Sequence, residues 1–148
     1  MQYRKDRKGN ELSILGYGCM RFTGHNGKID EEKAEQEIME AYRAGVNYYD
    51  TAYIYPGSEV ALGNILRKNQ IRDKVNIATK LPQYLISSQK KIDEYFAEEL
   101  RRLQTDHVDY YHNHHRQYPL LQLWGYSGGL GNVSLHLNFF LVCCIKKI

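Results

Sequence analysis

Hydrophobic residues in most of the chain follow two spacings in turn, and this alternation predicts strands followed by helices. Short apolar runs of strand length occur at residues 14–20, 46–49, 75–79 and 108–113. Between them, apolar residues recur at the helical period of about 3.6 residues. Ahead of the first run, the turn residues 8–11 predict an N-terminal β-hairpin. Strands that alternate with helices predict a parallel α/β sheet.

The ends of three helices can be predicted from local sequence. Asp30, followed by two glutamates, is a typical N-cap, and Gly45 suits the left-handed conformation that ends a helix. Ser58 is the expected N-cap of the second helix, and Ser87 or Ser88 that of the third. The side chains expected to face the sheet are Ala34, Ile38, Ala41, Tyr42, Val60, Ala61, Leu62, Ile65, Leu66, Ile92, Phe96, Leu100 and Leu103.

Four polar residues stand at or just beyond the ends of predicted strands. Asp50 follows the second apolar run, and Tyr55 lies five residues further on. Lys80 follows the third run, and His114 closes the fourth. The intervals are 30 residues from Asp50 to Lys80 and 34 from Lys80 to His114, close to the roughly 30 residues of one strand, one helix and two loops. Groups at this interval lie on the same rim of consecutive parallel strands, which is typical of an active site.

Three segments around these residues resemble the aldo/keto reductases. DTAYIY at 50–55, followed by GSEVALG, is similar to that family's Asp-Thr-Ala-x-x-Tyr-x-x-x-Glu signature. ATK at 78–80 is similar to its lysine strand, and VDYYHNH at 108–114 to its histidine strand. The resemblance is closest to a bacterial subgroup that often carries an iron–sulfur module. It implies a partial (β/α)8 TIM barrel of about four parallel β/α units, with the hairpin at the barrel floor.

The resemblance also implies a function, namely that of an oxidoreductase that reduces an aldehyde or ketone to an alcohol with NADPH. A carbonyl that accepts a hydride also needs a proton on its oxygen, and Tyr55 is the expected acid. A free phenol has a pKa of about 10, and a nearby ammonium, here Lys80, favours the phenolate. Asp50 would keep Lys80 charged, and His114 would hydrogen-bond the substrate oxygen or pass on a proton.

NADPH is the cofactor that the resemblance implies, with its nicotinamide ring near Gly18, Met20, Arg21 and Asp50. Taken alone, the two glycines of GYGCMR suggest a GxGxxG dinucleotide motif only weakly, because Arg21 occupies the place of the third glycine. The contacts to the cofactor's 2′-phosphate cannot be placed in this sequence. The choice of NADPH over NADH therefore rests on the family alone.

A cluster of histidines raises the question of a metal site. His112 and His114 would share one face of a strand, but two ligands do not complete the tetrahedral set that zinc prefers, and no metal is expected. His112 and Asn113 stand where the family usually has apolar residues, so in a buried strand they would need hydrogen-bond partners. Glu59 either belongs to the site or lies in the first turn of its helix, where the dipole favours it.

Length and charge limit how far the resemblance reaches. The chain has 148 residues, whereas a complete barrel needs about 250. We therefore expect the N-terminal half of a barrel at residues 1–115. All 17 acidic residues lie at or before Asp109, and the net charge of +3 comes from Arg116, Lys146 and Lys147. Residues 116–148 are thus expected to be a divergent tail, either out of frame or disordered.

The remaining features exclude several classes of protein. The charged start MQYRKDRKGNEL has no hydrophobic signal segment, which favours a cytoplasmic location. No nucleic-acid partner is expected because basic residues are not clustered, and no membrane span because residues 139–145 are too few. The expected partner is a small carbonyl substrate. The alternative function is a non-catalytic half-barrel that associates with itself or a partner through open sheet edges.

Overall fold

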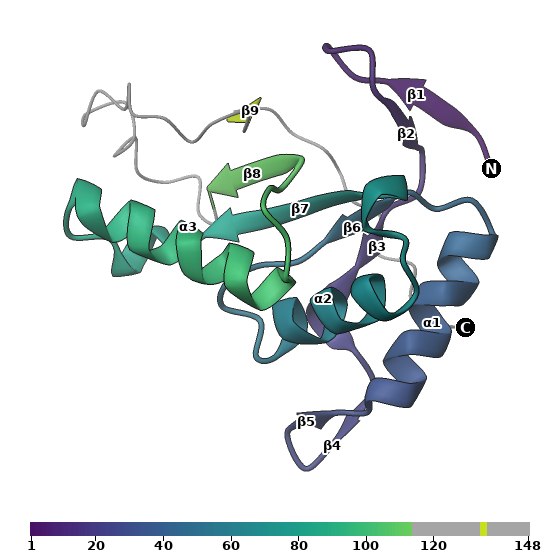
Figure 1. Ribbon diagram of the computed structural model, residues 1–148, viewed down its shortest axis with the longest axis horizontal. Coiled ribbons are helices and arrows are strands. Elements are labelled where there is room, and N and C mark those ends of the chain that lie inside the picture. The colour runs from purple at the N-terminus through teal and green to yellow at the C-terminus, as the bar shows by residue number, and fades with distance from the viewer. Residues whose placement is uncertain (114–133, 136–148) are drawn as a thin grey trace.

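The computed structural model describes residues 1–113 and 134–135, and its main feature is a parallel sheet (Figure 1). The strands follow the order β3-β6-β7-β8-β9, and each adjacent pair is parallel. Their bounds are β3 (Tyr17–Gly18), β6 (Tyr48–Asp50), β7 (Asn76–Leu81), β8 (Tyr110–Asn113) and β9 (Ser134–Leu135). The helices that connect successive strands as far as β8 are α1 (Glu31–Arg43), α2 (Ser58–Lys68) and α3 (Gln89–Leu103). This order is that of part of a TIM barrel, as the sequence predicts.

Shorter elements flank the sheet. Two antiparallel hairpins pair β1 (Tyr3–Lys5) with β2 (Glu11–Ser13) and β4 (Gly24–His25) with β5 (Lys28–Ile29). Single 3-10 turns form η1 (Cys19–Arg21), η2 (Arg72–Lys74) and η3 (Gln83–Leu85). The first hairpin confirms the prediction. The second was missed, although its turn residues Asn26 and Gly27 both have positive φ, the conformation that an Asn-Gly hairpin turn requires.

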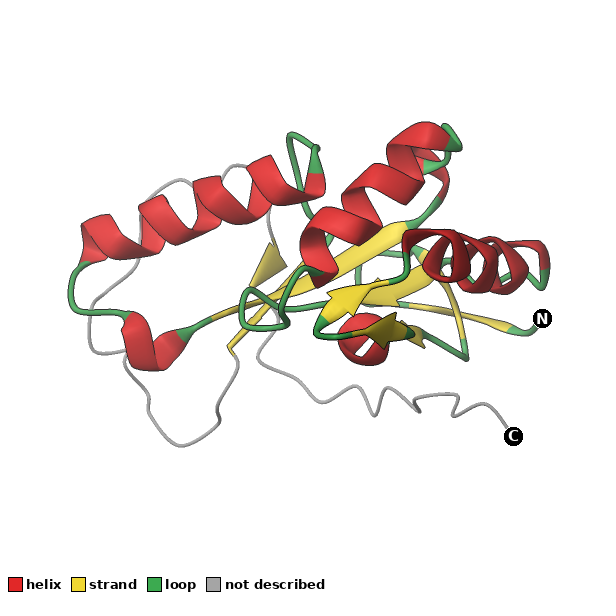
Figure 2. Ribbon diagram, turned by 90° about the horizontal axis from the view of Figure 1, so that it is seen from below, coloured by secondary structure: helices red, strands yellow, loops and turns green. Residues whose placement is uncertain are grey.

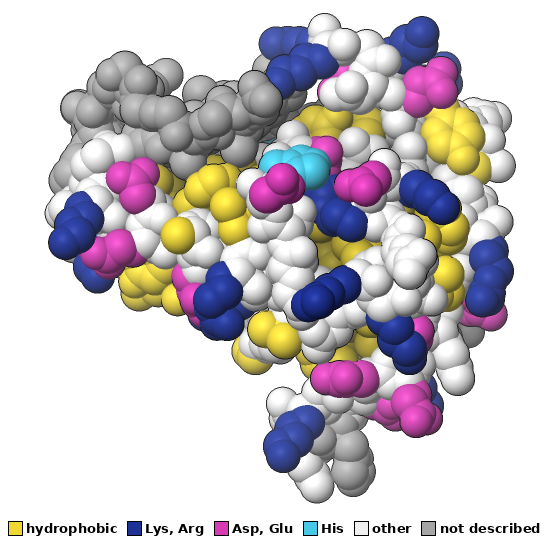
Figure 3. All heavy atoms as spheres, in the orientation of Figure 1, with side chains coloured by type: hydrophobic (Ala, Val, Ile, Leu, Met, Phe, Trp, Pro, Cys, Tyr) yellow, Lys and Arg dark blue, Asp and Glu magenta, His cyan; other side chains and the backbone are white. Residues whose placement is uncertain are grey.

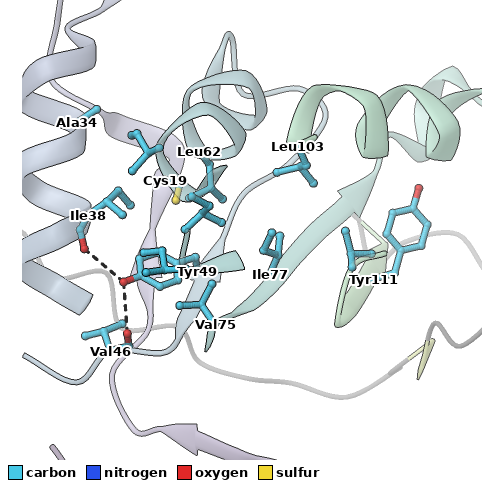
Figure 4. Close-up of a cluster of buried hydrophobic side chains, with 14 of the residues drawn as sticks. Cys19, Ala34, Ile38, Val46, Tyr49, Leu62, Val75, Ile77, Leu103 and Tyr111 are labelled. Atoms are coloured by element: carbon cyan, nitrogen blue, oxygen red, sulfur yellow. Dashed lines mark hydrogen bonds between the residues drawn. The ribbon is translucent and has the colours of Figure 1, made fainter. Parts of the chain in front are cut away.

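The strand register separates two faces of the sheet. One face carries Tyr49 of β6, Ile77 of β7 and Tyr111 of β8, which are buried in the main hydrophobic cluster (Figure 4). Figure 2 shows the helices along one face of the sheet, where this cluster lies. The opposite face carries Tyr48 and Ala78, which belong to a smaller cluster, and at its end the residues Asp50 and Lys80. The candidate catalytic groups therefore lie on the side of the sheet that the helices leave open.

Most helix boundaries agree with the sequence patterns. The Asp30 carboxylate caps α1 by accepting a hydrogen bond from the Lys33 amide, and Ser88 caps α3 in the same way through the Lys91 amide. Gly45, just after α1, has φ 89°. This is the left-handed conformation that favours glycine after a helix.

Three local predictions were wrong. The N-cap of α2 is Gly57, with φ 72°, and the Ser58 hydroxyl instead donates to the Cys19 carbonyl. Val60 is 42% exposed because it lies on the helix face that turns away from the sheet. The first strand is also shorter than the apolar run 14–20: Ile14 is 49% exposed and precedes β3.

Hydrogen bonds of two charged residues, Arg72 and Asp109, link β7 and β8 at the end opposite to Lys80. The Asp109 carboxylate accepts hydrogen bonds from the Ile77 amide at 2.8 Å and from the Arg72 guanidinium at 3.1 Å. Arg72 also donates to the carbonyl oxygens of Val75 and His107. The bonds to Asp109 and His107 connect two segments more than 30 residues apart and help to fix the register of the two strands.

The surface shown in Figure 3 is mixed in character. Lys and Arg side chains are interspersed with Asp and Glu, and small hydrophobic areas lie between them. Across the part of the chain that the structure describes, every helix is too short or too polar to cross a bilayer.

Two glutamates are buried between the helices and the sheet. Glu59 is 1% exposed and accepts a hydrogen bond from the Thr79 hydroxyl at 2.7 Å. Glu99 is fully buried and accepts one from the Tyr111 hydroxyl at 2.6 Å. Its other oxygen has no hydrogen-bond partner among the described residues. Burial raises the pKa of Glu99 to about 9, so this carboxyl is protonated at neutral pH.

Helices α2 and α3 touch closely at Gly63. A methyl group at this position would lie 2.6 Å from the Leu103 carbonyl carbon and 2.7 Å from the Arg102 carbonyl oxygen. Both neighbours are backbone atoms that cannot rotate away. We expect Gly63→Ala to lower the free energy of unfolding by up to about 2 kcal/mol, because a clash of about 1–3 kcal/mol opposes the helix-propensity gain of about 1.

Urea unfolding followed by circular dichroism checks this prediction. Val60→Ala, at an exposed position of the same helix, is the control and should be close to neutral. A Gly63→Ala protein as stable as its parent would show that the two helices have room to separate.

Glu99 should also make the stability depend on pH. Above pH 4.5 the unfolded chain releases this proton, whereas the folded chain keeps it until pH 9 or so, so stability falls as pH rises between these values. Glu99→Gln removes this loss, and its stability relative to the parent should rise by up to about 1.4 kcal/mol per pH unit from pH 5.5 to 7.5.

The neighbouring Glu98 provides a matched control. Hydrogen bonds from Arg101 and Arg102 lower the pKa of Glu98 to about 2, so it is ionised in both states throughout this range. The effect of Glu98→Gln should therefore not change with pH. The same pH-independent result for Glu99→Gln, in urea titrations at each pH, would contradict the buried neutral carboxyl.

Candidate active site

The sheet register brings two of the predicted catalytic residues together. Asp50 ends β6 and pairs with Ala78, so Lys80 of β7 lies one step further along on the same face. The Lys80 ammonium contacts an Asp50 carboxylate oxygen at 2.5 Å and donates to the Thr51 carbonyl at 2.8 Å. The two side chains are only 14% and 18% exposed. Because both charges are largely removed from water, a short and fixed contact between them is needed to offset the cost of desolvation.

Tyr55 reaches the same place from the loop between β6 and α2. Its ring centre lies 5.1 Å from the Lys80 nitrogen, within the range of a cation–π contact. The loop folds back through a hydrogen bond from the Tyr55 amide to the Ala52 carbonyl, and Gly57 ends it with a positive φ. Three of the four predicted residues, Asp50, Tyr55 and Lys80, are therefore one cluster.

The predicted cofactor residues lie beside this cluster. Gly18 of β3 pairs directly with Asp50, and η1 with Met20 and Arg21 follows it next to the end of β6. Met20 is 58% exposed, and Arg21 is exposed as well. An accessible apolar side chain and a cation on the turn that follows Gly18 fit the nicotinamide end of a dinucleotide.

Two hydroxyl groups attach η1 to the site. Ser58 donates to the Cys19 carbonyl and shares a hydrogen bond with Thr51, both at 2.8 Å. Thr51 in turn is the residue whose carbonyl binds Lys80. The sequence patterns predicted neither contact. Thr51 could have been singled out as the residue after Asp50, but Cys19 is 39 residues from Ser58, and no local signal links the two.

The histidine strand is only partly described. His114, the fourth predicted catalytic residue, lies outside the described residues. His112 pairs with Lys80 in the strand register, and its Nε2 atom lies 3.3 Å from the Tyr48 hydroxyl. The polar side chain at this unusual position thus has the partner that its environment demands. Within the described segments, no group of three or more His, Cys, Asp or Glu residues is placed to hold a metal ion.

The Lys80–Asp50 pair should also contribute to stability. Asp50→Asn leaves the half-buried ammonium with neutral partners, and we expect a loss of about 1–3 kcal/mol in the free energy of unfolding, somewhat below the cost of breaking a fully buried pair. Glu35→Gln is the matched control because it removes the same charge from the pair with Lys68, whose side chain is 70% exposed. That change should be nearly neutral. Equal effects of the two substitutions in urea titrations would show that Asp50 is no more important than a surface charge.

Comparisons with known proteins agree with this geometry. L-galactose dehydrogenase from Arabidopsis thaliana is 34% identical over 112 residues, covering 72% of this chain and 35% of the relative. Protein tas from Escherichia coli K12 is 32% identical over 141 residues, covering 80% of this chain and 40% of the relative. The chain therefore spans well under half the length of these relatives.

Solved structures give the same result. An aldo-keto reductase from Bacillus halodurans in its holo form superposes with a TM-score of 0.63 at 33% identity, over 76% of this chain and 40% of that one. An aldo-keto reductase from Klebsiella pneumoniae in complex with NADPH gives 0.68 at 25% identity, over 82% of this chain and 43% of that one. The profile of the aldo/keto reductase family matches residues 14–126. The chain belongs to the aldo/keto reductase family.

Proposed function

We propose that this chain carries the proton-donating half of an NADPH-dependent carbonyl reductase site, which reduces an aldehyde or ketone to an alcohol. The observation that carries the proposal is the placement of the Lys80 ammonium between the Asp50 carboxylate and the Tyr55 ring. A phenol, an ammonium and a carboxylate in contact at the ends of parallel strands have no evident packing role. They have the chemistry of an acid with a supporting charge.

Each side chain has a separate task in this proposal. Tyr55 gives its proton to the carbonyl oxygen as a hydride, supplied by NADPH when bound, reaches the carbonyl carbon. Lys80 stabilises the phenolate that remains, and Asp50 stabilises the ammonium of Lys80. His114 keeps the role that the sequence resemblance implies, as the group that orients the carbonyl oxygen.

The cofactor assignment rests on position and on a relative. Gly18 pairs with Asp50, and Met20 and Arg21 follow it in η1, where they would contact a nicotinamide ring. The Klebsiella pneumoniae relative is described in complex with NADPH, which supports NADPH here. The substrate remains a small carbonyl compound, and a cytoplasmic location and kinship with the iron–sulfur subgroup remain predictions from sequence.

A second candidate function follows from the edge of the sheet. Among the described strands, β3 pairs only with β6, and it is two residues long. A half-barrel with such an edge would pair with a second copy or with another chain. Light scattering decides this alternative, because a non-catalytic half-barrel of this kind should be a dimer at micromolar concentration.

Substitution of Tyr55 tests the reductase proposal. Tyr55→Phe should lower carbonyl reduction by about 100-fold or more, because it removes the proton donor, while NADPH binding stays nearly unchanged. Lys80→Met should also lower the rate, because the phenolate loses its cation. The assay is NADPH oxidation with nitrobenzaldehyde, with cofactor fluorescence as the binding measurement.

The form of the protein matters for this assay. The chain covers about 35–43% of the length of the relatives, so we expect little turnover from the chain alone. The assay is repeated after addition of the complementary C-terminal part of the Arabidopsis thaliana relative. Lys68→Met, at an exposed lysine, is the control and should not change the rate. Robust activity in Tyr55→Phe, or no turnover by the parent in either form, would contradict the proposal.

A further inference from the structure

The loop that carries Tyr55 is irregular and needs support from outside. Two backbone bonds shape the loop and its junction with α2: the Tyr55 amide donates to the Ala52 carbonyl, and the Ser58 amide donates to the Tyr55 carbonyl. Sites on loops are held less tightly than sites on strands or helices. Lys80 is fixed by its strand, so the distance between Lys80 and Tyr55 depends on how well this loop is held.

Helix α3 holds the loop at Tyr53. The Arg102 guanidinium lies 4.1 Å from the centre of the Tyr53 ring and donates a hydrogen bond to the Tyr53 carbonyl at 3.2 Å. Tyr95, two turns earlier on α3, meets the same ring edge to face at a centroid distance of 4.9 Å. Both the backbone and the side chain of Tyr53 are therefore fixed against one helix.

Arg102 is itself held in place by two acids. It donates to a Glu98 oxygen at 2.9 Å and to a Glu59 oxygen at 3.3 Å. The buried Glu59 also binds Thr79, the residue before Lys80 in β7. A series of short polar contacts thus leads from the strand of Lys80 through Glu59 and Arg102 to the loop of Tyr55.

We infer that Arg102 is a positioning residue for Tyr55. It acts through Tyr53: by fixing this residue against α3, Arg102 fixes the whole loop and the distance from the phenol to the Lys80 ammonium. The kinetic part of this inference rests on the proposed function, whereas the structural part does not. The competing explanation is that Arg102 only neutralises Glu59, in which case any cation at this position would suffice.

Two substitutions separate these explanations. Arg102→Lys keeps a cation for Glu59 but loses the planar group that lies on the Tyr53 ring. Tyr53→Leu removes the ring and leaves the pair of Arg102 and Glu59 intact. Arg101→Lys is the matched control, because Arg101 binds the same Glu98 and is 71% exposed. No bond from Arg101 to residues 51–57 is present among the described contacts.

The measurement is amide hydrogen exchange by NMR on the 148-residue chain. In Arg102→Lys and Tyr53→Leu, the amides of Tyr55 and Ser58 should exchange about tenfold faster than in the parent. The amides of Gly9 and Asn10, in a distant turn, should not change. Arg101→Lys should change neither set.

Three results would overturn the inference. One is exchange of the Tyr55 and Ser58 amides within about twofold of the parent in both variants. Another is equal acceleration of all amides, which would show a loss of global stability. The third is an exchange rate equal to that of the parent in Arg102→Lys together with faster exchange in Tyr53→Leu. This result would show that Arg102 acts through its charge alone.

A kinetic measurement completes the test and keeps the two proposals apart. When the chain shows turnover together with the complementary C-terminal part, Arg102→Lys should lower kcat about tenfold with little change in KM. The reason is that the acid is displaced while the binding groups remain. A protein without turnover that still shows the local exchange change would contradict the proposed function and leave the positioning role standing. Turnover with an unchanged kcat in Arg102→Lys would contradict the positioning role alone.

Discussion

The candidate site depends on the contact between Lys80 and Asp50, because the same ammonium also lies against the Tyr55 ring. Two charges that are mostly removed from water cost several kcal/mol to bury, and only short, fixed contacts offset this cost. The short contact exists because β6 and β7 pair in a register that places Lys80 one step beyond Asp50. That register is in turn supported at the opposite end of β7, where the Asn76 amide donates to the Asn47 carbonyl at 2.7 Å. The site and the far end of the sheet are therefore parts of one arrangement.

The part of the site on strands could be predicted from the sequence for a physical reason. Parallel strands present their carboxyl ends on the same rim, so polar residues that follow apolar runs at intervals near 30 residues must meet there. Asp50 and Lys80 satisfy this rule. Tyr55 lies on a loop, where no period applies, and it was predicted from its position five residues after Asp50 and from the resemblance to a known motif.

Two features of the site depend on contacts between distant parts of the chain. Serine is a typical N-cap residue, yet Gly57 rather than Ser58 is the N-cap of α2. The Ser58 hydroxyl instead binds Cys19 and Thr51. His112 looked out of place in a strand until the fold brought Tyr48 to it across 64 residues of sequence. Local rules weigh only near neighbours, whereas a buried polar group takes whichever partner the fold supplies.

The buried acids explain why a single arginine can serve the loop of Tyr55. Glu59 and Glu99 lie in the same layer, and the ionised form of each is disfavoured by burial. Two buried carboxylates would compete for Arg102, and the guanidinium would then be drawn away from Tyr53. Glu99 binds Tyr111 and stays protonated at neutral pH, so it does not compete with Glu59 for Arg102. Arg102 contacts Glu59 on one side and the Tyr53 ring on the other, so one side chain joins a buried acid of α2 to the loop of Tyr55.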